Sequence, residues 1–105
     1  MSSKQAVVQQ IFYPTSAKFN LDYYLTNHWP LVEKLWGPQG LLNWTVTTGG
    51  KDTGYSVQAT LVWESLEAFE NLQKVDEVMG DIPNFSDNAP TQWIGKVVGR
   101  GTITK

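Results

Sequence analysis

The chain contains no cysteine and only one histidine, His28, among its 105 residues. The absence of cysteine excludes disulfide bonds, thiolate metal sites and cysteine nucleophiles, and it agrees with a reducing compartment. We therefore expect a cytoplasmic protein. A transition-metal site would need carboxylates brought together from separate elements around that histidine, and no residue spacing indicates such a site. We expect no bound metal.

Basic residues and long apolar runs are also scarce. The eight Lys and Arg residues are scattered and the formal net charge is −2, so the basic stripe that a nucleic-acid-binding surface needs is missing. No stretch approaches the roughly 20 apolar residues of a membrane span, and the N-terminus is too polar for a signal peptide. We expect neither nucleic acid nor a membrane as a partner.

Signatures for binding nucleotide phosphates are absent as well. Gly50-Lys51 is followed by Asp52 instead of Ser or Thr, no glycine stands five residues earlier, and no G-x-G-x-x-G occurs. We therefore expect a protein that uses no cofactor.

Apolar and aromatic side chains are plentiful by contrast. The hydrophobic share is 41%, with five Trp, four Tyr and four Phe, which is enough material for a core in a chain of this length. A single domain over 1–105 is predicted, because two domains would each be too short to bury a core.

Hydrophobic periodicity predicts the order βαββαβ. β-rich runs predict strands over 5–13, 41–48, 55–64 and 91–104, and apolar residues at a spacing of three to four predict helices over 21–36 and 66–79. Asn20 is a candidate N-cap of the first helix, and Ser65 of the second. Pro30 lacks an amide hydrogen and should kink or restart the first helix. These elements make an α+β fold with a four-stranded antiparallel sheet.

Both faces of the predicted sheet are apolar. The first strand presents Val7, Ile11 and Tyr13 on one side, and Val8 and Phe12 on the other. Two helices can cover only one face, so the second face needs another cover, for which the chain has no further residues. A second copy of the chain is the simplest source, and we expect a homodimer.

His28 is the leading candidate for a functional residue. Imidazole titrates near neutrality, and His28 lies on the apolar face of the first helix, close to Tyr24 and beside the break at Pro30. The alternative is a core histidine hydrogen-bonded to a carbonyl that Pro30 leaves free. Aromatic residues including Tyr24, Trp44 and Phe85 could line a ligand cavity or could simply form the core.

The loop after the second helix holds two carboxylates, Asp81 and Asp87. They could form an acid/base pair, but carboxylates in loops rich in Pro, Asn and Ser usually cap turns. We interpret them as turn caps. Ile82 and Phe85 in the same loop favour a second hypothesis, that residues 81–88 close over the mouth of a pocket.

Four motifs in order along the chain resemble the EthD family, named for ethyl tert-butyl ether degradation. The motifs are Tyr23-Tyr24-x-x-x-His28-x-Pro30-Leu31-Val32, Leu35-Trp36-Gly37-Pro38 with Gly40-Leu41, Tyr55-Ser56-Val57-Gln58-Ala59, and Gly80-Asp81-Ile82-Pro83-Asn84-Phe85-Ser86-Asp87. The resemblance implies a dimeric α+β barrel, in which two ferredoxin-like halves press their sheets together. It also implies that His28, Tyr24, Asn84 and Phe85 belong to a pocket.

The resemblance implies a specific fold but does not imply a specific reaction. EthD-like proteins accompany oxidative degradation or polyketide pathways, and their wider superfamily includes isomerases, cyclases, monooxygenases and haem degraders, so the fold alone does not name a reaction. A second histidine that some cyclases and isomerases of the superfamily use is absent here.

Three functional hypotheses remain. In the first, a small apolar or aromatic metabolite binds between sheet and helices, contacted by Tyr24, Trp44, Asn84 and Phe85, and His28 moves a proton in an isomerisation, cyclisation or dehydration. The second is a binding or accessory protein without chemistry, in a degradation or polyketide pathway. The third is haem binding with His28 as the ligand.

Overall fold

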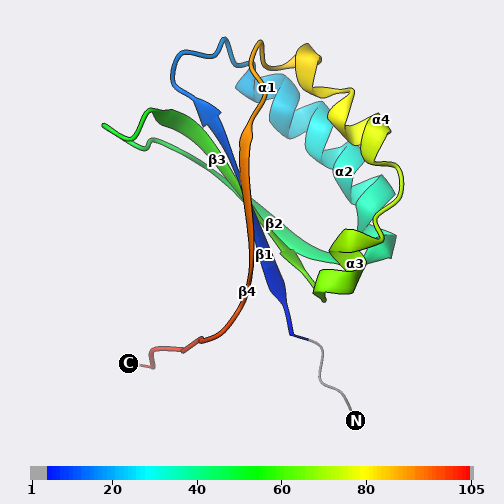
Figure 1. Ribbon diagram of the computed structural model, residues 1–105. Coiled ribbons are helices and arrows are strands. Elements are labelled where there is room, and N and C mark those ends of the chain that lie inside the picture. Colours follow the sequence, from blue (N-terminus) through cyan, green and yellow to red (C-terminus); the bar gives the residue numbers. More distant parts are fainter. Residues whose placement is uncertain (1–4, 105) are drawn as a thin grey trace.

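The structure, a computed structural model, is a four-stranded antiparallel sheet with all its helices on one face (Figure 1). It describes residues 5–104, so the first four residues of the predicted domain and Lys105 lie outside this range. Strand β1 (Val7–Pro14) pairs with β3 (Tyr55–Trp63) and with β4 (Thr91–Lys96), while β2 (Leu41–Thr48) pairs with the other edge of β3. The order β2-β3-β1-β4 confirms the predicted ferredoxin-like βαββαβ fold.

The first helical region begins at the predicted cap, and it changes its hydrogen-bond pattern before Pro30 without being interrupted. The Asn20 side chain accepts a hydrogen bond from the Tyr23 amide, 3.1 Å away, and caps α1 (Leu21–Tyr23). A single π-helical turn, η1 (Tyr24–His28), then leads into α2 (Trp29–Trp36), whose first turn contains Pro30. Pro30 has no amide hydrogen to donate, and the helix accommodates it with the π turn that ends just before α2. Such π turns are frequent at functional sites.

The second helical region differs from the single helix expected over 66–79. It consists of α3 (Leu66–Glu70), capped by the Ser65 hydroxyl, and α4 (Val75–Met79). Between them the Gln39 side chain, just before Gly40, accepts from the Gln73 amide (2.7 Å) and donates to the Gln73 carbonyl (3.1 Å). This side chain from another element satisfies backbone groups that a continuous helix would use itself, and the prediction of one helix was wrong.

The last strand is shorter than the predicted 91–104. It ends at Lys96, and beyond it the Val97 amide donates to the Ala6 carbonyl. β1 begins at Val7, so the segment after Val97 has no neighbouring strand to pair with. Residues 97–104 extend away from the sheet (Figure 1), and Val98 is 91% exposed.

The core lies between the helices and the sheet. β1 and β3 turn alternate side chains towards the helices, as period-two alternation requires. The buried apolar residues are Val7, Tyr13, Tyr24, Trp29, Val32, Trp36, Val57, Ala59, Leu61, Trp63, Val78 and Phe85. In the described part of the chain, no helix is long and apolar enough to cross a membrane.

Candidate functional site

A cavity of about 210 Å³ lies between the sheet and the helical layer. β1 and β3 form its floor, α2 forms one wall, and the α3–α4 region forms the other. Its lining is mostly apolar, with a few polar groups: the lining residues are Gln9, Ile11, Tyr13, Tyr24, His28, Trp29, Val32, Trp36, Leu61, Phe69, Glu70, Leu72, Val75, Val78, Met79, Ile82, Pro90 and Gln92. A concave, mostly apolar space with few polar groups is typical of small-molecule sites.

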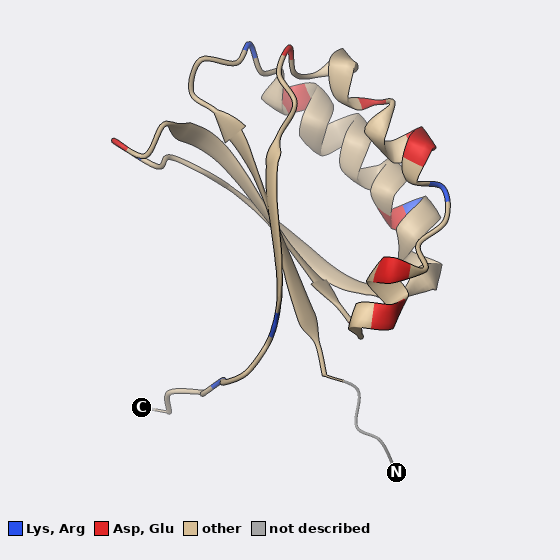
Figure 2. Ribbon diagram, viewed as in Figure 1, with Lys and Arg blue, Asp and Glu red and all other residues tan. Residues whose placement is uncertain are grey.

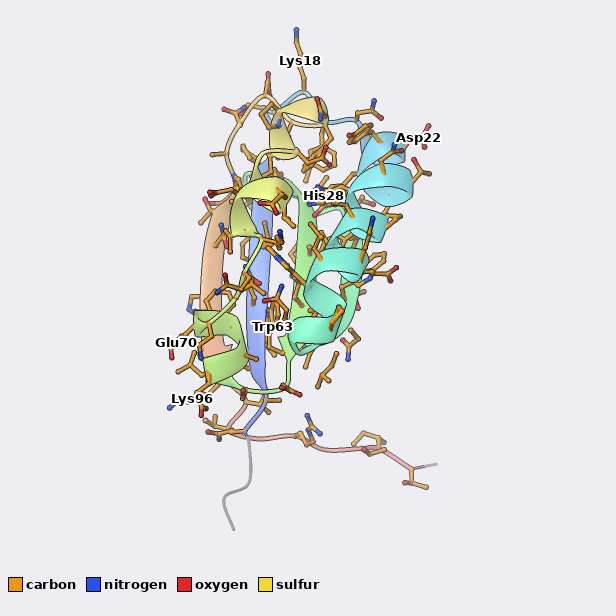
Figure 3. The ribbon with its side chains drawn as sticks, turned by 90° about the vertical axis from the view of Figure 1, so that its right-hand side faces the viewer. Lys18, Asp22, His28, Trp63, Glu70 and Lys96 are labelled. Carbon is orange, nitrogen blue, oxygen red and sulfur yellow. The ribbon has the colours of Figure 1, made fainter. Side chains whose placement is uncertain are left out.

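His28 lines this cavity from the π turn and is only 5% exposed. Its ring stacks on Tyr24, with centroids 5.4 Å apart and planes at 14°, and Phe85 packs against it at 4.6 Å. Figure 3 shows His28 between the helix that carries it and the segment that follows α4. The π turn and these two rings together fix the imidazole against the cavity.

Asp81 holds the other side of the His28 ring. Its Oδ2 lies 3.0 Å from Nδ1 of His28, while its Oδ1 accepts from the Tyr23 hydroxyl (2.7 Å) and from Nδ2 of Asn84 (2.9 Å). Two further donors thus fix the carboxylate that orients the imidazole. The arrangement is a His–Asp pair with a supporting tyrosine and asparagine.

The electrostatics of the pair favour a neutral ring beside an ionised carboxylate. Burial lowers the pKa of His28, and the hydrogen bond and charge of Asp81 oppose this without reversing it. Burial by itself would raise the pKa of Asp81, but hydrogen bonds from Asn84, Tyr23 and His28 lower it below its usual value. An ionised carboxylate can only accept, so the hydrogen bond places the ring proton on Nδ1.

Nε2 of His28 then carries a lone pair and has no hydrogen-bond partner among residues 5–104. A purely structural histidine would have both nitrogens satisfied by the protein. The alternative in which His28 binds a carbonyl freed by Pro30 is not what the structure contains, because Nδ1 pairs with Asp81. The free nitrogen can act as a base or hydrogen-bond acceptor towards the cavity.

Sequence analysis missed Asp81 as a partner of His28. It interpreted both loop carboxylates as turn caps, but Asp87 also bonds outside its own turn: its Oδ1 accepts from the amide of Lys18, 69 positions earlier, at 2.7 Å. Asp81 instead reaches a side chain 53 positions earlier in the chain. The available signal was its place in the EthD-like motif beside Asn84.

Not all of the predicted substrate-binding residues lie at the cavity. Tyr24 lines the cavity. Trp44 stacks on the outer side of Trp29, with centroids 4.5 Å apart, donates to Glu33 (2.9 Å), and does not line the cavity. Asn84 supports Asp81.

Phe85 lies behind His28 as part of the core, where it is 2% exposed. It is not among the residues that line the cavity. Its ring is therefore placed to support the imidazole.

No group of three or more potential metal ligands occurs within residues 5–104. The polar groups at the cavity are suited to hydrogen bonding and proton transfer.

Comparisons with known proteins identify relatives of the structure. No protein-family model matches the chain, and no curated protein does. An EthD-like protein from Ralstonia eutropha JMP134 superposes with a TM-score of 0.78 at 25% identity, covering 94% of this chain and 97% of that one. An EthD family protein from Bacillus halodurans C-125 gives a TM-score of 0.63 at 16% identity, covering 90% and 99%.

A third similar structure is SnoaB, a cofactor-independent oxygenase from Streptomyces nogalater, with a TM-score of 0.58 at 14% identity, covering 99% of this chain and 100% of that one. At such identity the likeness concerns the fold alone. The four sequence motifs and these superpositions both indicate similarity to EthD-like proteins. The resemblance predicted from the sequence is therefore confirmed: over nearly its whole length the chain is similar to EthD-like proteins and has their ferredoxin-like α+β fold.

Proposed function

We propose that the chain binds a small apolar or aromatic metabolite in the cavity and that His28 transfers a proton to or from it. The reaction class is cofactor-free isomerisation, cyclisation or dehydration. His28 is the acid/base, and Asp81 is the positioning residue that holds its tautomer and balances its charge when it is protonated.

One observation carries this proposal: His28 is fixed at Nδ1 by Asp81 while its Nε2 is unpartnered at an apolar cavity. Base, orienting carboxylate and a concave space for a reacting molecule are the parts that acid/base catalysis requires. The lowered pKa of His28 supports it, because a base must be neutral to accept a proton. SnoaB, described as a cofactor-independent oxygenase, supports the idea that this fold can host catalysis without a cofactor.

The size of the cavity limits the ligand. A dry cavity of about 150 Å³ in another protein binds benzene, so a cavity of about 210 Å³ suits one ring with substituents or two small fused rings. Haem is far larger, and the haem hypothesis receives no support from this geometry. The test of the proposal is the substitution His28→Gln, which should keep the cavity and remove proton transfer.

We also propose that the uncovered face of the sheet binds a second copy of the chain. Figure 1 shows no helix on that face, and Figure 2 shows that the strands are almost free of charge, with only Lys96 near the end of β4. Trp93 on β4 is 58% exposed. Charged side chains are the usual protection of an open sheet, and their absence favours a covered face.

Trp93→Lys should convert this dimer into a monomer, because it places an unpaired charge in an interface where the strand partner of Trp93 is the uncharged Gln10. Light scattering at micromolar concentration should give about twice the monomer mass for the parent and the monomer mass for the variant. Leu25→Lys, at an exposed apolar position in the helical layer, is the matched control and should remain dimeric. A parent protein that is monomeric would contradict the proposal.

A further inference from the structure

Tyr13 places at the cavity a hydroxyl group that makes no hydrogen bond to residues 5–104. Tyr13 lies on β1 on the cavity side, is 2% exposed, and lines the cavity. Its ring packs against Phe19, Tyr24 and Phe85, at centroid distances of 4.9, 5.8 and 5.7 Å. Within residues 5–104 its hydroxyl makes no hydrogen bond to the protein, and it is not among the fully buried unpartnered polar atoms, so it remains accessible from the cavity. A tyrosine hydroxyl that is accessible there is free to donate a hydrogen bond to a ligand.

Tyr13 and His28 share the same end of the cavity. The two aromatic rings that touch Tyr13, those of Tyr24 and Phe85, also touch His28, at 5.4 and 4.6 Å. All three polar side chains at this end, Tyr13, Tyr24 and His28, line the cavity. A ligand that contacts His28 in this cavity can therefore also contact Tyr13.

The two tyrosines are held in their neutral, donating form. Burial raises the pKa of Tyr13, and the neighbouring Tyr24 raises it further. Burial also raises the pKa of Tyr24, against a smaller opposing effect of the Trp29 indole. Neutral donors in a largely apolar site are the groups that stabilise negative charge developing on an oxygen atom.

We propose that the Tyr13 hydroxyl donates a hydrogen bond to a carbonyl oxygen of the ligand, and that the substrate is a small ring compound carrying a ketone, aldehyde or ester next to an acidic C–H bond. This rests on the proposed function, which it narrows to proton removal beside a carbonyl group. Tyr13 is then a catalytic residue in addition to His28.

The step balances without an oxidant or a co-reactant. The C–H bond next to the carbonyl breaks, its proton goes to Nε2 of His28, and its electron pair forms a C=C bond while the carbonyl π pair moves to oxygen. Tyr13 keeps its own proton and holds the resulting enolate oxygen, and the imidazolium is balanced by Asp81. If the imidazolium exchanges its proton with solvent before returning one to the same carbon, the result is exchange, and in a substrate with a conjugated double bond, return to the far carbon gives isomerisation.

Two ligands that differ only in the carbonyl group test this inference. The probes are 1-indanone and indane, with affinity measured for the parent, Tyr13→Phe and the control Tyr55→Phe, whose residue lies on β3 away from the cavity. Tyr13→Phe should weaken 1-indanone binding by roughly 3- to 10-fold and leave indane binding unchanged, and Tyr55→Phe should change neither. The variant should melt close to the parent, because the hydroxyl that it loses makes no hydrogen bond to residues 5–104.

The carbonyl stretching frequency of bound 1-indanone gives a second readout that needs no variant. It should be lower in the parent than in an apolar solvent, and Tyr13→Phe should reverse much of the shift. If both probes bind but neither affinity nor frequency depends on Tyr13, the inference is overturned and the proposed ligand cavity stands. If neither probe binds, the proposed function fails and the inference with it.

Discussion

In the variant His28→Gln, we expect proton transfer to fall by about 10²- to 10⁴-fold, the usual contribution of a positioned acid/base, while the fold survives. Glutamine can still donate to Asp81 in place of Nδ1, but it cannot accept and release a proton near neutral pH. The free energy of unfolding should stay within about 1 kcal/mol of the parent value. The measurement is the rate at which 1-indanone exchanges deuterium at the carbon next to its carbonyl group, followed by mass spectrometry.

Glu33→Gln is the matched control, because Glu33 lies on α2, the helix that follows the π turn of His28, but bonds Trp44 and does not line the cavity. It should exchange at the parent rate. The opposite result would be a His28→Gln variant that is strongly destabilised but catalyses exchange at the parent rate per folded molecule. That result would show that the role of His28 is structural. A parent protein that binds the ketone without accelerating exchange would favour the alternative of a binding protein without chemistry.

Phe85→Ala should destabilise the fold by about 3–5 kcal/mol, the usual cost of removing a buried phenylalanine ring. Phe85 is 2% exposed and its ring packs against Tyr13, Phe19, Tyr23, Tyr24 and His28. Since a domain has a total stability of only about 5–15 kcal/mol, this loss is a large part of the whole. Urea unfolding monitored by tryptophan fluorescence measures it.

This expectation departs from the hypothesis that residues 81–88 form a lid with Phe85 at the pocket mouth. Leu25→Ala, at an exposed position on η1, is the control and should change stability by no more than about 0.5 kcal/mol. If Phe85→Ala keeps the parent stability and loses only ligand binding, the lid hypothesis is right and Phe85 is a ligand contact.

Local signals account for the parts of the fold that the sequence predicts well. The strands follow from runs of β-branched and aromatic residues, and the first helical region follows from the Asn20 cap and from Pro30, all of which act within a few positions. The second helical region has a helical period throughout, but a contact from Gln39 decides that it is broken. Such a contact cannot be read from the segment itself.

The candidate site, like the fold, has residues that the sequence alone indicates and residues that only the structure brings together. His28 could be found from sequence because an imidazole on an apolar helix face is conspicuous, and Tyr24 because it stands one helical turn away. Asp81 could not, because the loop that carries it meets His28 only through the tertiary fold. Tyr13 looked like one more aromatic of a central strand, and its unpartnered hydroxyl is visible only in the structure.

The protonation state of the single histidine tests the central claim most directly, and long-range ¹H–¹⁵N NMR measures it without interference because no other imidazole is present. Since burial lowers its pKa from the usual 6.5, His28 should be neutral at about pH 7 and should gain its proton only as the pH falls below 6.5. The neutral ring should carry its proton on Nδ1, facing Asp81, and leave Nε2 bare at the cavity. A ring that is charged at about pH 7, or whose proton sits on Nε2, would contradict the account.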